Sequence, residues 1–226
     1  MGLWKDVRRR IEGIGVDRRL DLSLRREYFG NRKGGWWLFP EELNASSIVY
    51  SVGIGENLTF DLALIERFGL TMHAFDPTPH ALAYVASRSW PPELKVHPWG
   101  LAHYDGTAGF RPSTDPREPS HTLLEDPERE VDAVVGSVYR LESLASRLGH
   151  AAIDVLKMDI EGAEYEVIED LSRSAIRPTQ ILVEFHHRFH GVGVARTNSA
   201  IRLLREIGYG LYSVSESGRE YSFRRN

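Results

Sequence analysis

Two glycines and one acidic residue form the clearest chemical pattern in the sequence. Gly53 and Gly55 follow an apolar run at 47–52 that predicts a buried strand, and they precede a helical pattern. A glycine at such a turn lets the backbone approach a ligand closely, because it has no Cβ. Asp76 stands 21 residues after Gly55, at the end of the next predicted strand, where a carboxylate can accept hydrogen bonds from a ribose diol. The spacing predicts a nucleotide-type site.

The charge of this loop indicates which ligand it binds. The loop has no basic residue and Glu56 adds a negative charge, which disfavours the pyrophosphate of a nicotinamide dinucleotide and suits S-adenosylmethionine, whose sulfonium and ammonium groups are cationic. Asn57 stands where a third glycine is expected, and asparagine tolerates left-handed backbone geometry. An alternative role for Asp76 is to cap a helix with Pro77 in its first position, which is compatible with ribose binding.

A second group of chemically active residues follows the fourth and fifth predicted strands, whose ends flank the place expected for a donor methyl group. We predict that Asp159, Glu161 and His186 are catalytic. Histidine is suited to remove a proton near neutral pH because its unperturbed pKa is about 6.5. The alternative for Glu161 is a structural role, as an acidic residue in the first turn of a helix that complements the helix dipole, and the same role is expected for Glu164.

Other roles for polar and aromatic residues stay open. Asp159, Glu184 and His186 offer hard oxygen and imidazole ligands for a divalent cation, although no metal is assigned in the prediction. His187 and His190 are interpreted as polar loop residues. Trp36 and Trp37 are interpreted as aromatic residues of the core or of a lid, with stacking on the donor as the alternative. His121, in a long loop, is a candidate for contact with the substrate.

Strand-like and helical patterns alternate from residue 46 onward. The predicted strands are 47–52, 70–75, 94–97, 152–158, 180–185, 209–214 and 220–223. This order predicts an α/β fold with a doubly wound sheet of about seven strands and a C-terminal antiparallel hairpin. The stretch 111–133, rich in Pro, Ser, Asp and Glu, breaks the alternation and is predicted to be a long loop, which either closes over a substrate or lacks fixed structure.

The composition excludes several classes of site. The 226 residues are 42% hydrophobic and include no Cys, which excludes disulfides, Cys-ligated zinc, iron–sulfur clusters and a thiol nucleophile. No run approaches the ~18 apolar residues of a membrane span, so a cytoplasmic protein is expected. Residues 1–35 hold ten basic and five acidic residues, a net charge of +5 within a chain of −4.

The basic N-terminal segment has two interpretations. It is either an arm that binds an anionic partner or an amphipathic helix that packs Leu3, Val7, Ile11 and Ile14 on the body. Interleaved acidic residues favour the helix. The predicted organisation is therefore an N-terminal helical extension over 1–45 and one ligand-binding domain over 46–226.

Four segments together resemble a known family. They are Gly-Ile-Gly-Glu-Asn-Leu-Thr-Phe-Asp (53–61), Ala-Phe-Asp-Pro-Thr-Pro (74–79), Lys-Met-Asp-Ile-Glu-Gly-Ala-Glu (157–164) and Leu-Val-Glu-Phe-His (182–186). This set resembles the FkbM family of S-adenosylmethionine-dependent methyltransferases, in its methyltransferase-like branch with Gly-Gly-Trp-Trp at 34–37. The resemblance covers about residues 34–225. It implies the seven-stranded, Rossmann-like class I methyltransferase fold.

The resemblance also implies site residues. S-adenosylmethionine would lie over the loop Gly53, Ile54, Gly55, Glu56, Asn57, with Asp76 at the ribose and Gly100 and Leu101 beside the adenine. Pro77 and Asp159 complete the predicted cofactor contacts, and the position of Asp159 at a strand end places it beside the sulfonium. The family commonly carries Asp where Ser51 stands.

The expected activity is methyl transfer to a hydroxyl oxygen of a small molecule or sugar, with no nucleic-acid partner. The acceptor preference comes from the resemblance alone. Two alternatives are a nicotinamide-dependent oxidoreductase and a non-catalytic interaction protein with a basic arm.

Overall fold

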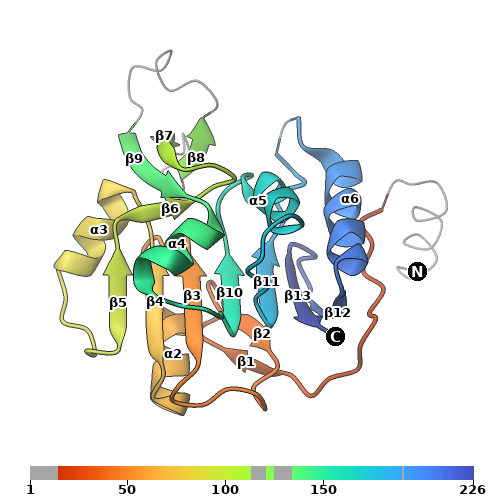
Figure 1. Cartoon of the computed structure of the whole chain (residues 1–226), viewed down its shortest axis with the longest axis horizontal. Coiled ribbons are helices and arrows are strands. Elements are labelled where there is room, and N and C mark those ends of the chain that lie inside the picture. Colours follow the sequence, from red (N-terminus) through yellow and green to blue (C-terminus); the bar gives the residue numbers. More distant parts are fainter. Residues whose placement is uncertain (1–14, 113–120, 125–133, 190) are drawn as a thin grey trace.

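A seven-stranded sheet forms the centre of the computed structural model, which describes residues 15–112, 121–124, 134–189 and 191–226 (Figure 1). In spatial order the strands are β12 (Tyr209–Val214), β13 (Glu220–Arg225), β11 (Gln180–Glu184), β10 (Val155–Met158), β3 (Ile48–Val52), β4 (Thr71–Phe75) and β5 (Leu94–His97). The strands from β11 to β5 are parallel, and β13 is antiparallel to both neighbours. The predicted α/β sheet with a C-terminal hairpin is confirmed.

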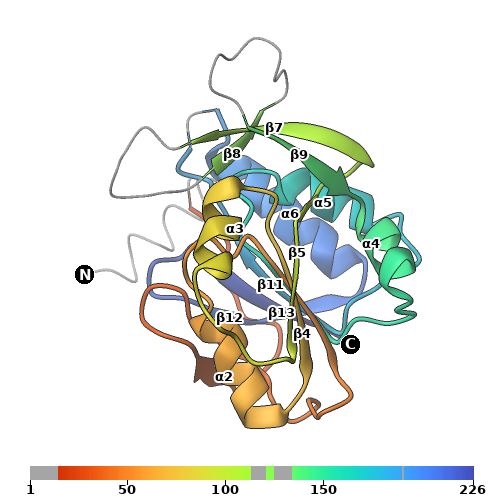
Figure 2. The ribbon, with the colours of Figure 1, turned by 90° about the vertical axis from the view of Figure 1, so that its left-hand side faces the viewer.

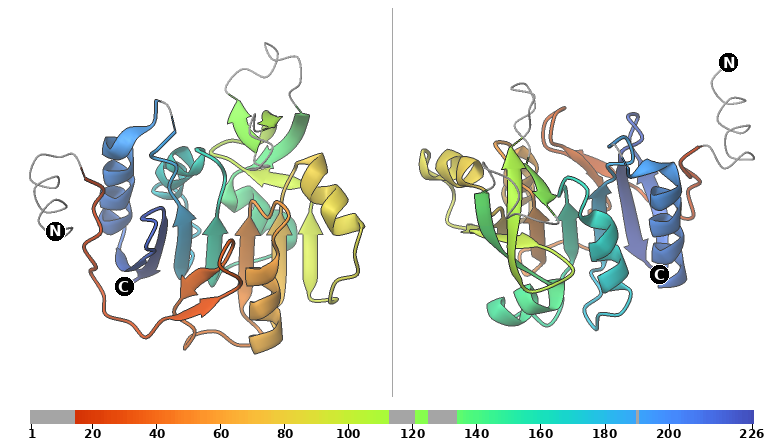
Figure 3. Two further views of the ribbon diagram at one scale, coloured as in Figure 1. Left: turned by 180° about the vertical axis from the view of Figure 1, so that it is seen from behind. Right: turned by 90° about the horizontal axis from the view of Figure 1, so that it is seen from above.

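Helices cover both faces of this sheet (Figures 1 and 3). On one face lie α2 (Thr59–Phe68) and α3 (Pro79–Ala86), and on the other α4 (Leu141–Leu148), α5 (Glu164–Leu171) and α6 (Gly193–Glu206). Each face has its own buried apolar cluster, because the central strands are buried on both sides. No helix in the described ranges is both long and apolar enough to cross a bilayer.

Residues 15–45 contain a hairpin of β1 (Glu27–Phe29) and β2 (Trp36–Leu38) instead of helix. The hairpin lies on the α2 side of the sheet, with Trp36 in the core. Phe39 N–H donates to Gln180 Oε1 at 3.2 Å, and Gln180 Nε2 donates back to Phe39 O at 2.8 Å, which joins this segment to β11. The predicted helix of Leu3, Val7, Ile11 and Ile14 lies outside the described residues.

A second sheet lies over the carboxyl ends of the central strands (Figure 2). Its order is β6 (Trp99–Leu101), β9 (Val134–Tyr139), β7 (Gly106–Pro112) and β8 (His121–Leu124). The prediction of a loop over 111–133 is therefore corrected in part, because 111–112 belong to β7 and 121–124 form β8. Residues 113–120 and 125–133 are outside the described ranges.

Candidate functional site

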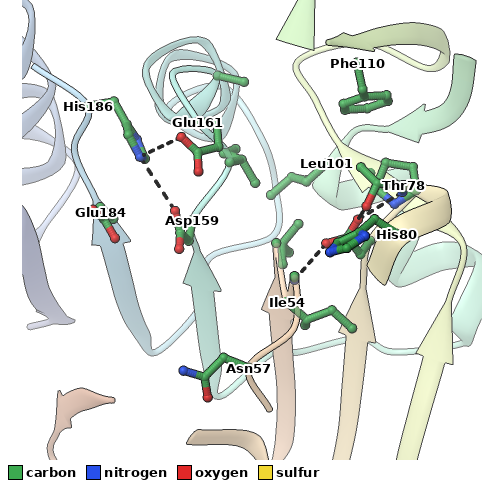
Figure 4. A pocket seen from close by; sticks show the side chains of 18 of the residues that line it. Ile54, Asn57, Thr78, His80, Leu101, Phe110, Asp159, Glu161, Glu184 and His186 are labelled. Carbon is green, nitrogen blue, oxygen red and sulfur yellow. Dashed lines mark hydrogen bonds and ion pairs between the residues drawn. The ribbon is translucent and has the colours of Figure 1, made fainter. Parts of the chain in front are cut away.

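A pocket of about 370 Å³ opens at the carboxyl ends of β3, β4, β10 and β11, beneath the second sheet (Figure 4). Its volume is in the range of small-molecule sites. The structure brings every predicted site residue to its lining: Gly53, Ile54, Gly55, Glu56, Asn57, Asp76, Pro77, Gly100, Leu101, Asp159, Glu161 and His186. Figure 4 shows two ends, with Thr78, His80 and Leu101 at one and Asp159, Glu161 and His186 at the other. We call them the loop end and the acidic end.

The two loop glycines are needed for different reasons. Gly53 has φ +74°, and a Cβ there would lie 1.7 Å from the carbonyl oxygen of Asp159. The backbones of two adjacent strand ends thus approach too closely for any other residue. Gly55 has φ +49°, and a Cβ at this position would meet nothing within 4 Å, so only backbone geometry restricts it, and open space remains above it.

Asn57 does not take up the left-handed geometry expected for a substitute glycine, since Glu161 is the one non-glycine residue with positive φ in the described ranges. Instead its Oδ1 accepts hydrogen bonds from Thr59 N–H at 3.2 Å and Thr59 Oγ1 at 2.7 Å. Its Nδ2 donates to Asn31 Oδ1 at 3.2 Å. Asn57 therefore supports the start of α2 and ties the loop to the β1–β2 segment.

Asp76 connects the loop to α3. Its Oδ2 accepts from Gly55 N–H at 3.1 Å, and its Oδ1 accepts from Thr78 N–H at 2.9 Å and Thr78 Oγ1 at 2.6 Å. The helix cap is Thr78, with Pro79 in the first helical position, which corrects the alternative of an Asp76 cap followed by Pro77. Asp76 is 5% exposed, and its Oδ2 keeps a second lone pair for a ligand.

The acidic end is built around His186. Its Nδ1 lies 3.1 Å from Oε1 of Glu164, which is fully buried. Its Nε2 lies 3.3 Å from Glu161 Oε2 and 3.7 Å from Asp159 Oδ1. Glu184, in the same pocket, forms an ion pair with Arg219 at 3.1 Å.

These contacts change the protonation expected for His186. Burial alone would lower the pKa of His186, but the hydrogen bond to Glu164 and the charges of Asp159 and Glu161 outweigh it and raise the pKa to about 9. The imidazole therefore holds a proton at neutral pH, whereas the sequence-based prediction uses its unperturbed pKa. Burial and the neighbouring Asp159 raise the pKa of Glu184 to about 7.

The backbone at Glu161 is unusual. Its φ of +53° lies in the left-handed region, which costs a non-glycine residue about 1–2 kcal/mol. The turn from β10 into α5 thereby directs the Glu161 carboxylate toward His186 (Figure 4).

Sequence reasoning missed two buried groups of this site. The sequence indicates only a first-turn acid at Glu164, but this carboxylate accepts hydrogen bonds from Gly162 N–H, His186 N–H and the imidazole. Lys157 donates to the carbonyl oxygens of Val52 at 3.1 Å and Gly53 at 2.6 Å. The signal that could have identified Lys157 is a lysine inside an otherwise apolar strand.

Other candidates lie elsewhere. Trp36 is buried in the core and Trp37 packs edge-on against Tyr28, so neither lines the pocket. His187 is also outside the lining, and burial lowers its pKa. His190 and the side chain of His121 are not among the described parts of the chain.

Comparison with known proteins gives a consistent set of relatives. The chain is 26% identical to probable methyltransferase-like protein 24 of Rattus norvegicus over 70% of this chain and 39% of that protein. It is 27% identical to the 31-O-demethyl-FK506 methyltransferase FkbM of Streptomyces tacrolimicus, covering 77% of this chain and 76% of that protein. The chain spans about two fifths of the length of the rat and human methyltransferase-like proteins.

A solved structure agrees in fold. The crystal structure of the methyltransferase FkbM from Methylobacillus flagellatus superposes with a TM-score of 0.50 at 13% identity, over 82% of this chain and 45% of that one. The family model described as the methyltransferase FkbM domain matches residues 45–211. That match covers the five parallel strands of the central sheet and both ends of the pocket, and the chain therefore belongs to the FkbM methyltransferase family.

Proposed function

We propose that this chain binds S-adenosylmethionine at the loop end of the pocket and transfers its methyl group to a hydroxyl oxygen of a small molecule or sugar. The observation that carries the proposal is that one pocket joins the glycine loop and Asp76 to the cluster of Asp159, Glu161 and His186. A methyl donor and an acceptor must meet in such a shared space, because the reaction is a direct displacement.

The loop end supplies groups that suit the donor. The free lone pair on Asp76 Oδ2 can accept a hydrogen bond from a ribose hydroxyl. Gly100 and Leu101 offer an apolar wall for the adenine, and Gly55 leaves room above the loop. The carboxylate of Glu56 and the acidic end suit a cationic donor.

The acidic end supplies groups for the acceptor. Transfer breaks the bond between the donor's sulfur and the methyl carbon and forms a bond from that carbon to the acceptor oxygen, which must release its proton. The proton acceptors available are carboxylates, because His186 already carries a proton. The name of the Streptomyces relative refers to methylation at an oxygen, which supports a hydroxyl acceptor here.

The decisive test is calorimetric titration of S-adenosylmethionine into the full chain and the Asp76→Ala variant. We expect the dissociation constant to rise about tenfold or more in the variant, because a hydrogen bond to a charged group contributes about 1.5–3 kcal/mol. Glu66→Gln, on the exposed side of α2, is the matched control and should bind as the parent does.

Two outcomes would reject the assignment. One is unchanged donor affinity in a folded Asp76→Ala protein. The other is thermal stabilisation by a nicotinamide dinucleotide without any by S-adenosylmethionine, since a ligand stabilises the state that binds it.

A further inference from the structure

Three residues of the acidic end have the arrangement of a cation site. Asp159 follows β10, while Glu184 ends β11 and His186 lies two residues beyond it. Each offers one ligand atom, and the three atoms lie within 4.8 Å of one another. Because β10 and β11 are adjacent parallel strands, the sheet itself holds the three groups at one edge of the pocket (Figure 4).

The imidazole is oriented as in a metal ligand. The Glu164 carboxylate is fully buried, and its two oxygens accept from Gly162 N–H at 2.8 Å, His186 N–H at 2.9 Å and His186 Nδ1 at 3.1 Å. The carboxylate of Glu164 acts as the acceptor in all three hydrogen bonds, so the hydrogen of the third bond is on Nδ1 of His186. The other ring nitrogen, Nε2, faces the pocket. Metal-binding histidines regularly donate their second N–H to a carboxylate in this way.

The surroundings favour a positive ion next to Nε2. Asp159, Glu161 and Glu164 all lie within 3.7 Å of the one imidazole. Asp159 Oδ1 is buried and has no hydrogen bond, and Arg219, which pairs with Glu184, is 42% exposed. A buried acceptor oxygen without a donor is unfavourable, and a bound cation would give it a partner.

We propose that Asp159, Glu184 and His186 bind a divalent first-row cation such as Mn²⁺ at the acidic end. Two carboxylates and one imidazole suit Mn²⁺, because carboxylate oxygens prefer hard ions and the imidazole nitrogen is a common ligand of transition metals. Binding displaces the proton from Nε2. Three protein ligands leave open positions for water or an acceptor oxygen.

The role of this cation rests on the proposed function. The cation would lower the pKa of an acceptor hydroxyl beside it. The Glu161 carboxylate would take that proton as the oxygen forms its bond to the methyl carbon and the carbon–sulfur bond breaks. Glu161 is thus left as the proton acceptor, because Asp159 and Glu184 are occupied as ligands.

The site can be tested by electron paramagnetic resonance, in which free aqueous Mn²⁺ gives a sharp signal that is lost on binding. MnCl₂ is titrated into the full chain after chelator treatment, at near-neutral pH. We expect one strong site, and an affinity about tenfold or more lower in Asp159→Asn, Glu184→Gln and His186→Gln. Glu66→Gln, which neutralises an exposed acidic residue on α2, is the matched control and should keep the site.

Circular dichroism establishes that each variant is folded. The Mn²⁺ titration of the wild-type chain tests the site independently of any variant. Absence of Mn²⁺ binding to the wild-type chain, or equal binding by all the folded variants, would overturn the proposal. Donor titration into the chelator-treated chain separates the two ideas. Donor binding without Mn²⁺ binding leaves the proposed function standing, and Mn²⁺ binding without donor binding leaves only the cation site.

Discussion

Lys157 holds the backbone of the glycine loop at 53–57 in place. It is 6% exposed, and its ammonium group holds the carbonyl oxygens of Val52 and Gly53 from the neighbouring strand. Asp61 on α2 is 2% exposed. Burial raises the pKa of Asp61, and the charge of Lys157 opposes that rise. The backbone of the loop therefore rests on a buried lysine whose charge also acts on Asp61.

Replacement of Lys157 by methionine should be strongly destabilising. Lys157→Met leaves two carbonyl oxygens without their donor and removes the charge that opposes the raised pKa of Asp61, and each buried polar group left unpaired costs about 1–3 kcal/mol. Urea unfolding followed by circular dichroism measures the loss. The double variant Lys157→Met with Asp61→Asn should regain part of it, because no uncompensated charge remains. A single variant as stable as the parent would show that the contacts of the Lys157 ammonium group contribute nothing to stability.

The loop glycines allow a matched comparison. Gly53→Ala places a Cβ 1.7 Å from a carbonyl oxygen, whereas Gly55→Ala meets nothing within 4 Å, and both have positive φ. We expect Gly55→Ala to lose about 1–2 kcal/mol for its backbone geometry and Gly53→Ala to lose clearly more. Equal urea midpoints for the two variants would disprove the close approach of β3 and β10.

The site residues differ in how far the sequence can predict them. Gly53, Gly55, Asp76, Asp159 and His186 are recognisable because their types follow strand ends at characteristic spacings. The roles of Glu164 and of the Lys157–Asp61 pair are not, since they depend on which distant atoms are buried beside them. The raised pKa of His186 has the same origin, because three carboxylates reach it from different positions.

Among the elements, the central sheet was predictable and the second sheet was not. Strands such as β3 and β11 are mainly apolar and are buried on both sides, and such segments can be recognised without knowledge of tertiary contacts. In β9 the burial is partial and irregular, so residues 134–139 show no regular alternation of buried and exposed side chains that would identify a strand. The 27–38 hairpin escapes prediction for a similar reason, because its strands have three residues each.

The cap of α3 can be tested at the level of the element. Thr78 Oγ1 accepts from Ala81 N–H and donates to Asp76. Thr78→Ala should lower the free energy of unfolding by about 1 kcal/mol and weaken donor binding, because Asp76 loses a partner that orients it. Thr78→Ser keeps the hydroxyl and should preserve both properties. Thermal denaturation and donor titration of the two variants decide the matter.

Across the whole molecule, the pocket lies at the carboxyl ends of the central strands, and a histidine cluster lies on the face of the sheet that carries α4. His73 Nδ1 is 3.0 Å from His97 Nε2, and His150 Nδ1 is 2.8 Å from the hydroxyl of Tyr50. Burial, together with the neighbouring His150, His97 and Lys95, lowers the pKa of His73 to about 4. Burial also lowers the pKa of His97 and of His150.

This cluster should make the fold sensitive to acid. The unfolded chain binds protons at these histidines below about pH 6.5, whereas folded His73 binds its proton near pH 4, so the free energy of unfolding falls as the pH drops between these values. The shift at His73 corresponds to about 3 kcal/mol when complete. Urea midpoints measured from pH 7 to pH 4 should therefore fall less steeply in His73→Phe than in the parent, while His103→Gln, at an exposed position, should follow the parent. Parallel pH profiles for the parent and His73→Phe would show that the cluster is not the source of acid sensitivity.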